Sequence, residues 1–162
     1  MTRTSRIITL FFLVAAIGSV TAARAQTMNY GPSITLEQAK AVAAPAIAEA
    51  RKNNWTMAIA IVDTHGELVY FEKMDDTQQA SVVVSQEKAR SAARFKRPTK
   101  AFQDMLAAGS DGVRVLRLKG AVPVEGGLPI VVGNKVIGGI GVSGGTSAED
   151  GVVAKAGVSA LG

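Results

Sequence analysis

Residues 135–150 read KVIGGIGVSGGTSAED, and the arrangement of the rest of the chain follows from this stretch. Its first part mixes β-branched residues with glycines, which predicts a buried strand that another backbone or a flat ligand can approach closely. Gly144 and Gly145 then permit a turn, and Thr146 with Glu149 has the spacing of a helix capping box. We therefore expect a strand, a glycine turn and a capped helix in direct succession.

A glycine turn that ends at a helix N-terminus is also typical of phosphate sites, so a nucleotide-binding function has to be considered. The spacing G-x-G-x-x-G occurs only at Gly139, Gly141 and Gly144, inside the expected strand, and the pattern G-x-x-x-x-G-K-[ST] is absent. Glu149 and Asp150 already complement the positive end of the helix dipole. We therefore interpret the stretch as a structural corner between a strand and a helix.

The N-terminus has the three parts of a secretory signal peptide. Two arginines precede an apolar run over residues 7–20, and an A-x-A cleavage site follows at residues 23–25. Because the apolar run is short for a membrane span, we expect removal of residues 1–25 and export to the periplasm or the extracellular space, with an uncleaved anchor as the alternative. The mature chain is then a single domain over residues 26–162, in which we expect no membrane span.

Charge and cysteine content exclude several classes of function. The formal net charge is +5 for the full chain and falls to +2 once the three arginines of the signal peptide are removed. Nucleic-acid binding therefore loses its compositional support, because only a local cluster of charge remains. Cysteine is absent, which excludes thiol catalysis, iron–sulfur clusters and thiolate ligation of haem.

The order of the predicted elements indicates an α+β domain, with an antiparallel sheet flanked by helices. Thr35 and Gln38 cap the first helix, and the turn at residues 63–66 joins the first two strands into a hairpin. The expected strands cover residues 55–62, 68–74, 128–132 and 135–143, and the expected helices cover residues 35–53, 81–95, a short segment capped by Thr99, and 148–161. The last helix is expected to bury Val152, Val153, Ala156 and Ala160. Residues 113–118 and 121–125 are expected to be extended or mixed.

The densest polar feature is the stretch at residues 87–100, which has six cations and one acid. Helical spacing divides it into two neighbouring stripes. The stripes are Lys88, Ser91 and Phe95 on one side and Arg90, Arg94 and Arg97 on the other. A wall with aromatic, hydroxyl and guanidinium groups suits a flat, apolar ligand that bears carboxylates, because arginine pairs with carboxylates bidentately. A solvated face or a subunit contact is the alternative.

No catalytic constellation is recognisable. One histidine cannot supply a histidine metal cage, no G-x-S-x-G elbow exists, and neither Ser91 nor Ser143 has an identifiable base beside it. Acid pairs such as Glu72 with Asp75 fall in turns, and we interpret them as solvated carboxylates. His65, in the hairpin turn, could bind a metal or haem iron, but we interpret it as a solvated turn residue. The residues alone therefore predict a secreted α+β ligand-binding domain.

The mature chain resembles the GlcG/HbpS family of haem-binding, or haem-degrading, domains over nearly its full length. No single motif is diagnostic, but their order and spacing make the resemblance specific. The matching motifs are LEQA at 36–39, AIAIVD at 58–63 with GELV at 66–69, KAR at 88–90 with PT at 98–99, PVEGGLPI at 123–130, and VIG at 136–138 continuing to Ser143.

The resemblance implies a profilin-like or PAS-like fold, with a five-stranded antiparallel sheet and a tendency to form homo-oligomers. Characterised members of the family bind haem, and slow haem degradation or iron handling has been proposed for them. Other members accompany glycolate metabolism without a settled biochemical role. The expected function is thus that of an exported haem-binding protein, and whether it is an enzyme stays open.

The same resemblance assigns roles to residues of the cationic stretch. Lys88, Arg90 and Ser91 match the helix segment that faces haem in the family, and Ser91 falls where a hydroxyl lies near the iron. Serine is a weak iron ligand, which implies an exposed site of low affinity or a hydroxyl held near iron through water. The candidates for the haem propionates are Arg90, Arg94 and Lys96, and the candidates for ring contact are Phe95 and Met74.

Two other classes of function stay open at this point. One is a non-catalytic binding module for another small anionic ligand or a corrinoid, which a cation-rich groove would also serve. The other is an accessory protein whose function is contact with a sensor or transport partner.

Overall fold

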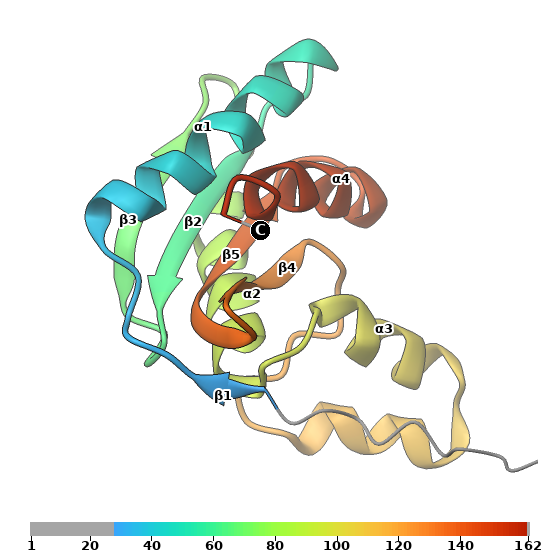
Figure 1. The fold of residues 1–162 in the computed structure, drawn as a ribbon. Coiled ribbons are helices and arrows are strands. Elements are labelled where there is room, and N and C mark those ends of the chain that lie inside the picture. The colour runs from blue at the N-terminus through green and yellow to red at the C-terminus, as the bar shows by residue number, and fades with distance from the viewer. Residues whose placement is uncertain (1–27, 162) are drawn as a thin grey trace, which may run out of the picture.

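The computed structural model describes residues 28–161, which form a sheet with helices on both faces (Figure 1). The predicted signal peptide lies outside the described residues. In chain order the elements are β1 (Asn29–Tyr30), α1 (Leu36–Lys52), β2 (Ala58–Asp63), β3 (Leu68–Lys73), α2 (Ser81–Phe95), α3 (Thr99–Ala107), the 3₁₀ helix η1 (Ser110–Arg117), β4 (Gly127–Val132), β5 (Lys135–Ser143) and α4 (Ser147–Val158). No helix among residues 28–161 is long and apolar enough to cross a membrane.

Strand β5 is the centre of the sheet. It pairs antiparallel with β2 and with β4, and β2 in turn pairs antiparallel with β3. Strand β1 pairs with the start of β5 in the parallel direction, with Asn29 opposite Lys135 and Tyr30 opposite Val136. The α+β class and the number of strands are thus confirmed, but the sheet is mixed and the expectation of a purely antiparallel sheet was wrong. A strand of two residues has no periodicity from which its presence or direction could be predicted.

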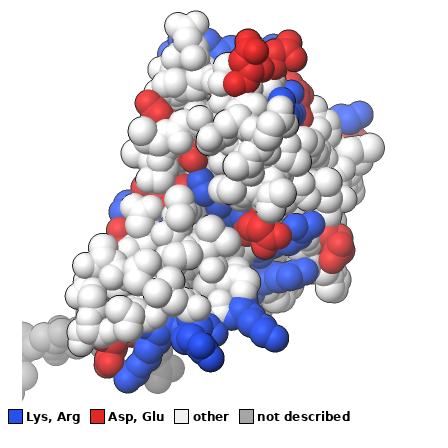
Figure 2. All heavy atoms as spheres, turned by 180° about the vertical axis from the view of Figure 1, so that it is seen from behind, with Lys and Arg blue, Asp and Glu red and all other residues white. Residues whose placement is uncertain are grey.

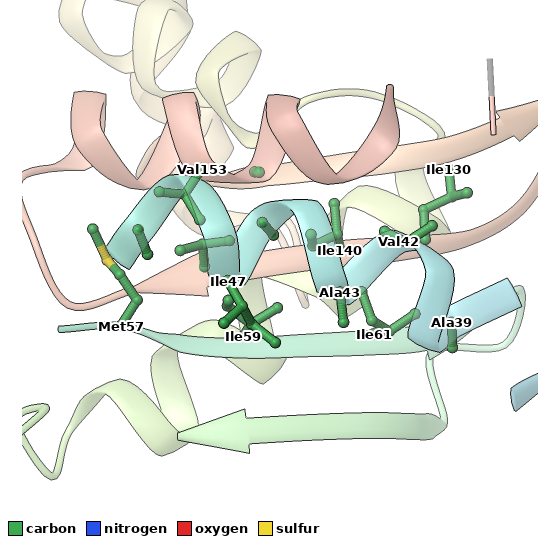
Figure 3. Packing of buried hydrophobic residues seen from close by; sticks show 14 of the residues in the cluster. Ala39, Val42, Ala43, Ile47, Met57, Ile59, Ile61, Ile130, Ile140 and Val153 are labelled. Carbon is green, nitrogen blue, oxygen red and sulfur yellow. The ribbon is translucent and has the colours of Figure 1, made fainter. Parts of the chain in front are cut away.

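The main hydrophobic core lies between the sheet and the pair of helices α1 and α4. Side chains from both helices and from the sheet point into the same space in Figure 3. The largest contributions come from isoleucines and valines of the strands, with alanines of α1 letting this helix approach closely. The labelled residues are Ala39, Val42, Ala43, Ile47, Met57, Ile59, Ile61, Ile130, Ile140 and Val153.

Helix α2 covers the opposite face of the sheet, and the glycines of β5 make room for it. A methyl group on Gly141 would overlap the backbone of Ser85 and Ala89, and one on Gly139 would overlap the carbonyl oxygen of Ala89. A smaller apolar cluster fills the space around this contact. The glycines of the strand therefore admit another backbone, that of α2, at close range.

Both predicted capping boxes are present. Thr35 caps α1 together with Gln38, and Thr146 caps α4 together with Glu149. The prediction that Thr99 caps the short helix was wrong. Thr99 is the first residue of α3, and its hydroxyl instead accepts a hydrogen bond from the amide of Gly127 at 2.9 Å.

Two further expectations about helices need correction. Residues 110–117 form η1, so the expectation of an extended or mixed segment at residues 113–118 was wrong. Val152, expected in the core, is 48% exposed, and α4 instead buries Asp150, Val153, Ala154 and Gly157. The small side chains of α4 allow several apolar stripes of equal quality, so spacing alone did not identify the buried one.

Candidate functional site

The C-terminal half of α2 holds most of the residues for which a ligand role was predicted. The helix ends where Lys96 takes a left-handed conformation, with φ of 53°, and Pro98 follows two residues later. Proline disfavours a helical conformation of the residue before it, which explains why α2 does not continue past this point. On the face seen in Figure 2, the largest groups of Lys and Arg atoms lie in the lower half, with some acids among them.

Lys88 does not reach this surface. Its side chain is 1% exposed, and its Nζ donates to Asp150 Oδ2 at 2.7 Å and to the carbonyl oxygen of Val142 at 3.1 Å. Burial raises the pKa of the Asp150 carboxyl, although the adjacent Lys88 ammonium acts in the opposite direction. Sequence reasoning placed Asp150 only at the helix dipole. Its spacing of three and four residues before Val153 and Ala154 was the available signal that it faces inward.

Ser91 is also fully buried, beneath the connection between η1 and β4. Its hydroxyl accepts a hydrogen bond from the backbone amide of Val122 at 3.1 Å. A contact between this hydroxyl and a haem iron would therefore require the Val122 segment to move. The structure does not bring Ser91 and the exposed cations to one surface.

Arg90 and Arg94 both reach the turn between β2 and β3. Arg90 Nε donates to the carbonyl oxygen of Gly66 at 3.1 Å, and Arg94 Nε donates to that of His65 at 2.7 Å. Arg90 also pairs with Glu87 at 2.8 Å, whereas Arg94 lies 3.7 Å from Glu67. The side chain of Arg94 is still 50% exposed, so its guanidinium remains accessible at the surface.

Aromatic rings lie among the cations at the end of α2. The rings of Phe95 and Phe102 are packed edge to face, with centroids 5.1 Å apart. The guanidinium of Arg97 lies 5.6 Å from the centroid of Phe102, and Lys96 Nζ lies 5.1 Å from the centroid of Tyr30. We call Arg94, Lys96 and Arg97 the cationic end of α2.

The cationic end of α2 is only partly neutralised. Among residues 28–161, neither Lys96 nor Arg97 forms an ion pair with a carboxylate. Only Arg94 of the three has one, the 3.7 Å contact with Glu67. The surface can therefore accept an anionic ligand without first breaking strong pairs.

Met74 lies apart from these residues. It follows the far end of β3 and packs against the core on the α1 face of the sheet. A surface hollow of about 330 Å³ beside it is lined by polar side chains, including Arg51 and Glu72. The structure therefore does not bring Met74 together with Phe95.

The corner between β5 and α4 is occupied by carboxylates of the chain itself. Asp150 Oδ1 accepts from the amide of Gly145 at 3.1 Å, and Glu149 Oε2 accepts from that of Thr146 at 2.7 Å. This supports the interpretation of a structural corner rather than a phosphate site. Within the described part of the chain, no three His, Cys, Asp or Glu side chains come together as a metal site.

Comparison with known proteins points to one family. The family model described as "Haem degrading protein HbpS-like" matches residues 34–159. Protein GlcG of Escherichia coli strain K12 is 40% identical over 95 residues, which cover 56% of this chain and 71% of GlcG.

Solved structures share the fold. The ORFY protein of Klebsiella pneumoniae, of the family DUF336, superposes with a TM-score of 0.74 at 28% identity, over 83% of this chain and 94% of its own. A double mutant of HbpS from Streptomyces reticuli has a TM-score of 0.74 at 27% identity, over 87% of this chain and 95% of its own. The structure described as a PduOC:heme complex has a TM-score of 0.71 at 23% identity, over 80% of this chain and 95% of its own.

Proposed function

Because this chain belongs to the HbpS-like family of haem degrading proteins, we propose that it binds haem at the cationic end of α2. The observation that carries this proposal is the group of three cations, Arg94 and Arg97 exposed and Lys96 half-buried, set among aromatic rings at one end of one helix. Haem is flat and apolar and bears two propionates, so it needs both kinds of contact. A protein of the same fold has been described as a heme complex, which supports this class of ligand.

Each residue at the cationic end of α2 has a role in this proposal. Arg94, Lys96 and Arg97 bind the propionates, because guanidinium and ammonium groups form charge-assisted hydrogen bonds with carboxylates. Phe95, which is partly exposed, contacts the ring. Arg90 contributes less, since its guanidinium is already paired with Glu87 and bonded to Gly66.

A hemin titration of the chain from Gln26 onwards tests this proposal. Every residue of both hydrophobic clusters lies within this part of the chain, so it keeps the whole described core. We expect a Soret band that saturates near one haem per chain. The double charge reversal Lys96→Glu with Arg97→Glu is expected to weaken binding at least about tenfold.

The matched control is the double charge reversal Lys40→Glu with Lys155→Glu. Both residues are exposed, and they lie on α1 and α4, on the other side of the sheet. This variant changes the net charge equally and should bind hemin like the unmodified protein. Equal weakening in the two variants, or a linear response to hemin, would count against a specific site.

Haem degradation and iron handling are part of the same proposal, supported by the family to which the chain belongs. The test is incubation of the haem complex with ascorbate under air, followed by the Soret band and by release of iron to a chelator. Loss of the Soret band with iron release would establish degradation. A stable band would limit the function to binding or transfer of haem.

We also propose that the protein is exported and forms homo-oligomers. Export rests on the signal-peptide pattern of residues 1–25. It is tested by N-terminal sequencing of the protein from the periplasm or the medium, which should begin at Gln26.

Self-association is supported by large apolar side chains exposed on α3, η1 and the connection to β4. These are Met105, Val113, Leu116, Leu118 and Val124. Light scattering after gel filtration should show an oligomer that Leu116→Ser weakens.

A further inference from the structure

The proposed function leaves the iron ligand unassigned, and the surroundings of Ser91 make this residue a poor choice. Serine is a weak ligand, and this hydroxyl is buried and bonded to Val122. We propose that His65 supplies the imidazole that binds the haem iron, an inference that rests on the proposed function. His65 is the only histidine of the chain, and its side chain is 81% exposed.

The backbone of His65 is fixed beside the cationic end of α2. Arg94, a member of that group, donates from Nε to the carbonyl oxygen of His65 at 2.7 Å. On the other side, Asp63 Oδ1 accepts from the amides of His65 and Glu67 at 2.8 and 2.9 Å. The backbone of the turn is therefore held from two sides beside Arg94, and its imidazole is exposed to solvent.

The polar neighbours of the imidazole lie on its Nδ1 side. Nδ1 lies 3.4 Å from the hydroxyl of Thr64 and 3.8 Å from Asp63 Oδ2. The Thr64 hydroxyl can bond Nδ1 in either direction and the carboxylate is beyond hydrogen-bond distance, so among residues 28–161 Nε2 is the ring nitrogen without a partner. The residues present thus fit a haem ligand in donor type and in exposure.

The other side chains with suitable donor atoms near the cationic end of α2 are occupied or distant. The hydroxyl of Tyr30 donates to the carbonyl oxygens of Ala93 and Arg94 at 3.2 and 2.9 Å. Met74 lies on the α1 face of the sheet, away from this surface. The sequence predicted a solvated turn residue at position 65, and the side chain is indeed exposed; the bond from Arg94 adds that this turn lies beside the cationic end of α2.

The test is resonance Raman spectroscopy of the ferrous haem complex, combined with hemin titration, on the chain from Gln26 onwards. The unmodified protein is expected to show an iron–histidine stretching band. His65→Ala is expected to lose that band and to bind hemin about tenfold more weakly. Added imidazole should restore nitrogen ligation in this variant.

The matched control for the iron–histidine band is Glu67→Ala, in the same turn, which removes an exposed carboxylate paired with Arg94 at 3.7 Å and leaves the imidazole in place. This variant should keep the band. The inference is overturned if His65→Ala keeps both the band and the affinity, or if the unmodified protein binds hemin saturably without the band. Absence of any saturable binding would overturn the proposed function itself, and these results are distinguishable from one another.

Discussion

Lys88 Nζ lies 2.7 Å from Asp150 Oδ2, and this ion pair is almost completely buried. It joins α2, on one face of the sheet, to α4, on the other, near the end of the central strand β5 (Figure 1). Both groups make further hydrogen bonds, since Lys88 also donates to the carbonyl oxygen of Val142 and Asp150 also accepts from the amide of Gly145. Because the pair connects elements 62 residues apart in the sequence, it ties the two helices into one body.

Breaking this pair should destabilise the fold strongly. Lys88→Met leaves the Asp150 carboxylate buried without its cation, and we expect a loss of about 3–5 kcal/mol in the free energy of unfolding. Urea denaturation measures it. As a control, Lys100→Met removes the exposed pair with Asp104, which should cost less than about 1 kcal/mol. Similar losses in the two variants would mean that Lys88 is more hydrated than the structure shows.

The contact between α2 and β5 leads to a second prediction. In Gly141→Ala, the added methyl would overlap the backbone of Ser85 and Ala89, and neither can yield without shifting α2. We expect a loss of about 3 kcal/mol or more in the free energy of unfolding, at the upper end for overpacked cores. Thermal unfolding followed by circular dichroism provides the measurement.

Gly133→Ala is the comparison for this variant. Gly133 has φ of 55° and no atom within 4 Å of an added methyl, so its substitution costs only the backbone strain of a left-handed residue, about 1–2 kcal/mol. If Gly141→Ala were no more harmful than Gly133→Ala, the packing of α2 on β5 would be looser than described.

The fold was predictable where a local pattern decides it. Strand β5 and helix α2 have the expected bounds, because glycine spacing, helical periodicity and Pro98 each act over a few residues. The burial of Lys88 was not predictable, since a lysine in a cationic stretch has the pattern of a solvated residue. Its partner, Asp150, is distant in the sequence and lies in the first turn of α4, just after the cap at Thr146.

The candidate site shows the same division. Helical spacing brought Arg90 and Arg94 together correctly, because both lie on one helix. Whether Met74 or His65 approaches them depends on the direction of β3 and on the position of the β2–β3 turn across the sheet. These are tertiary relationships, and no spacing within one element contains them.

A third prediction concerns Ser91. Because its hydroxyl accepts from the partly buried amide of Val122, Ser91→Ala removes this hydrogen bond, and we expect a loss of about 1 kcal/mol in the free energy of unfolding. The affinity for hemin should change less than about twofold, since the hydroxyl is not at the surface. Urea denaturation and hemin titration of the same variant measure both effects. Loss of hemin binding with unchanged stability would return Ser91 to the haem site.

The last prediction concerns pH and rests on Tyr70. Its hydroxyl donates to Glu72 Oε2 at 2.8 Å, and this hydrogen bond, with partial burial and the charge of Glu72, raises the pKa of Tyr70 above its ordinary value of about 10. The folded protein thus holds this proton more tightly than the unfolded chain. The contribution to stability is therefore present below pH 10 and is lost as the pH rises through the raised pKa.

Tyrosinate absorbance measures this titration directly. The chain has two tyrosines, so Tyr30→Phe isolates the signal of Tyr70. Glu72→Gln in that background removes the charged acceptor, and the pKa of Tyr70 should fall towards the ordinary value, with a smaller decline in stability above pH 10. Glu67→Gln, at the residue directly before β3, should leave the titration of Tyr70 unchanged. Identical tyrosinate curves with and without Glu72 would mean that the hydroxyl of Tyr70 is not bonded to it in solution.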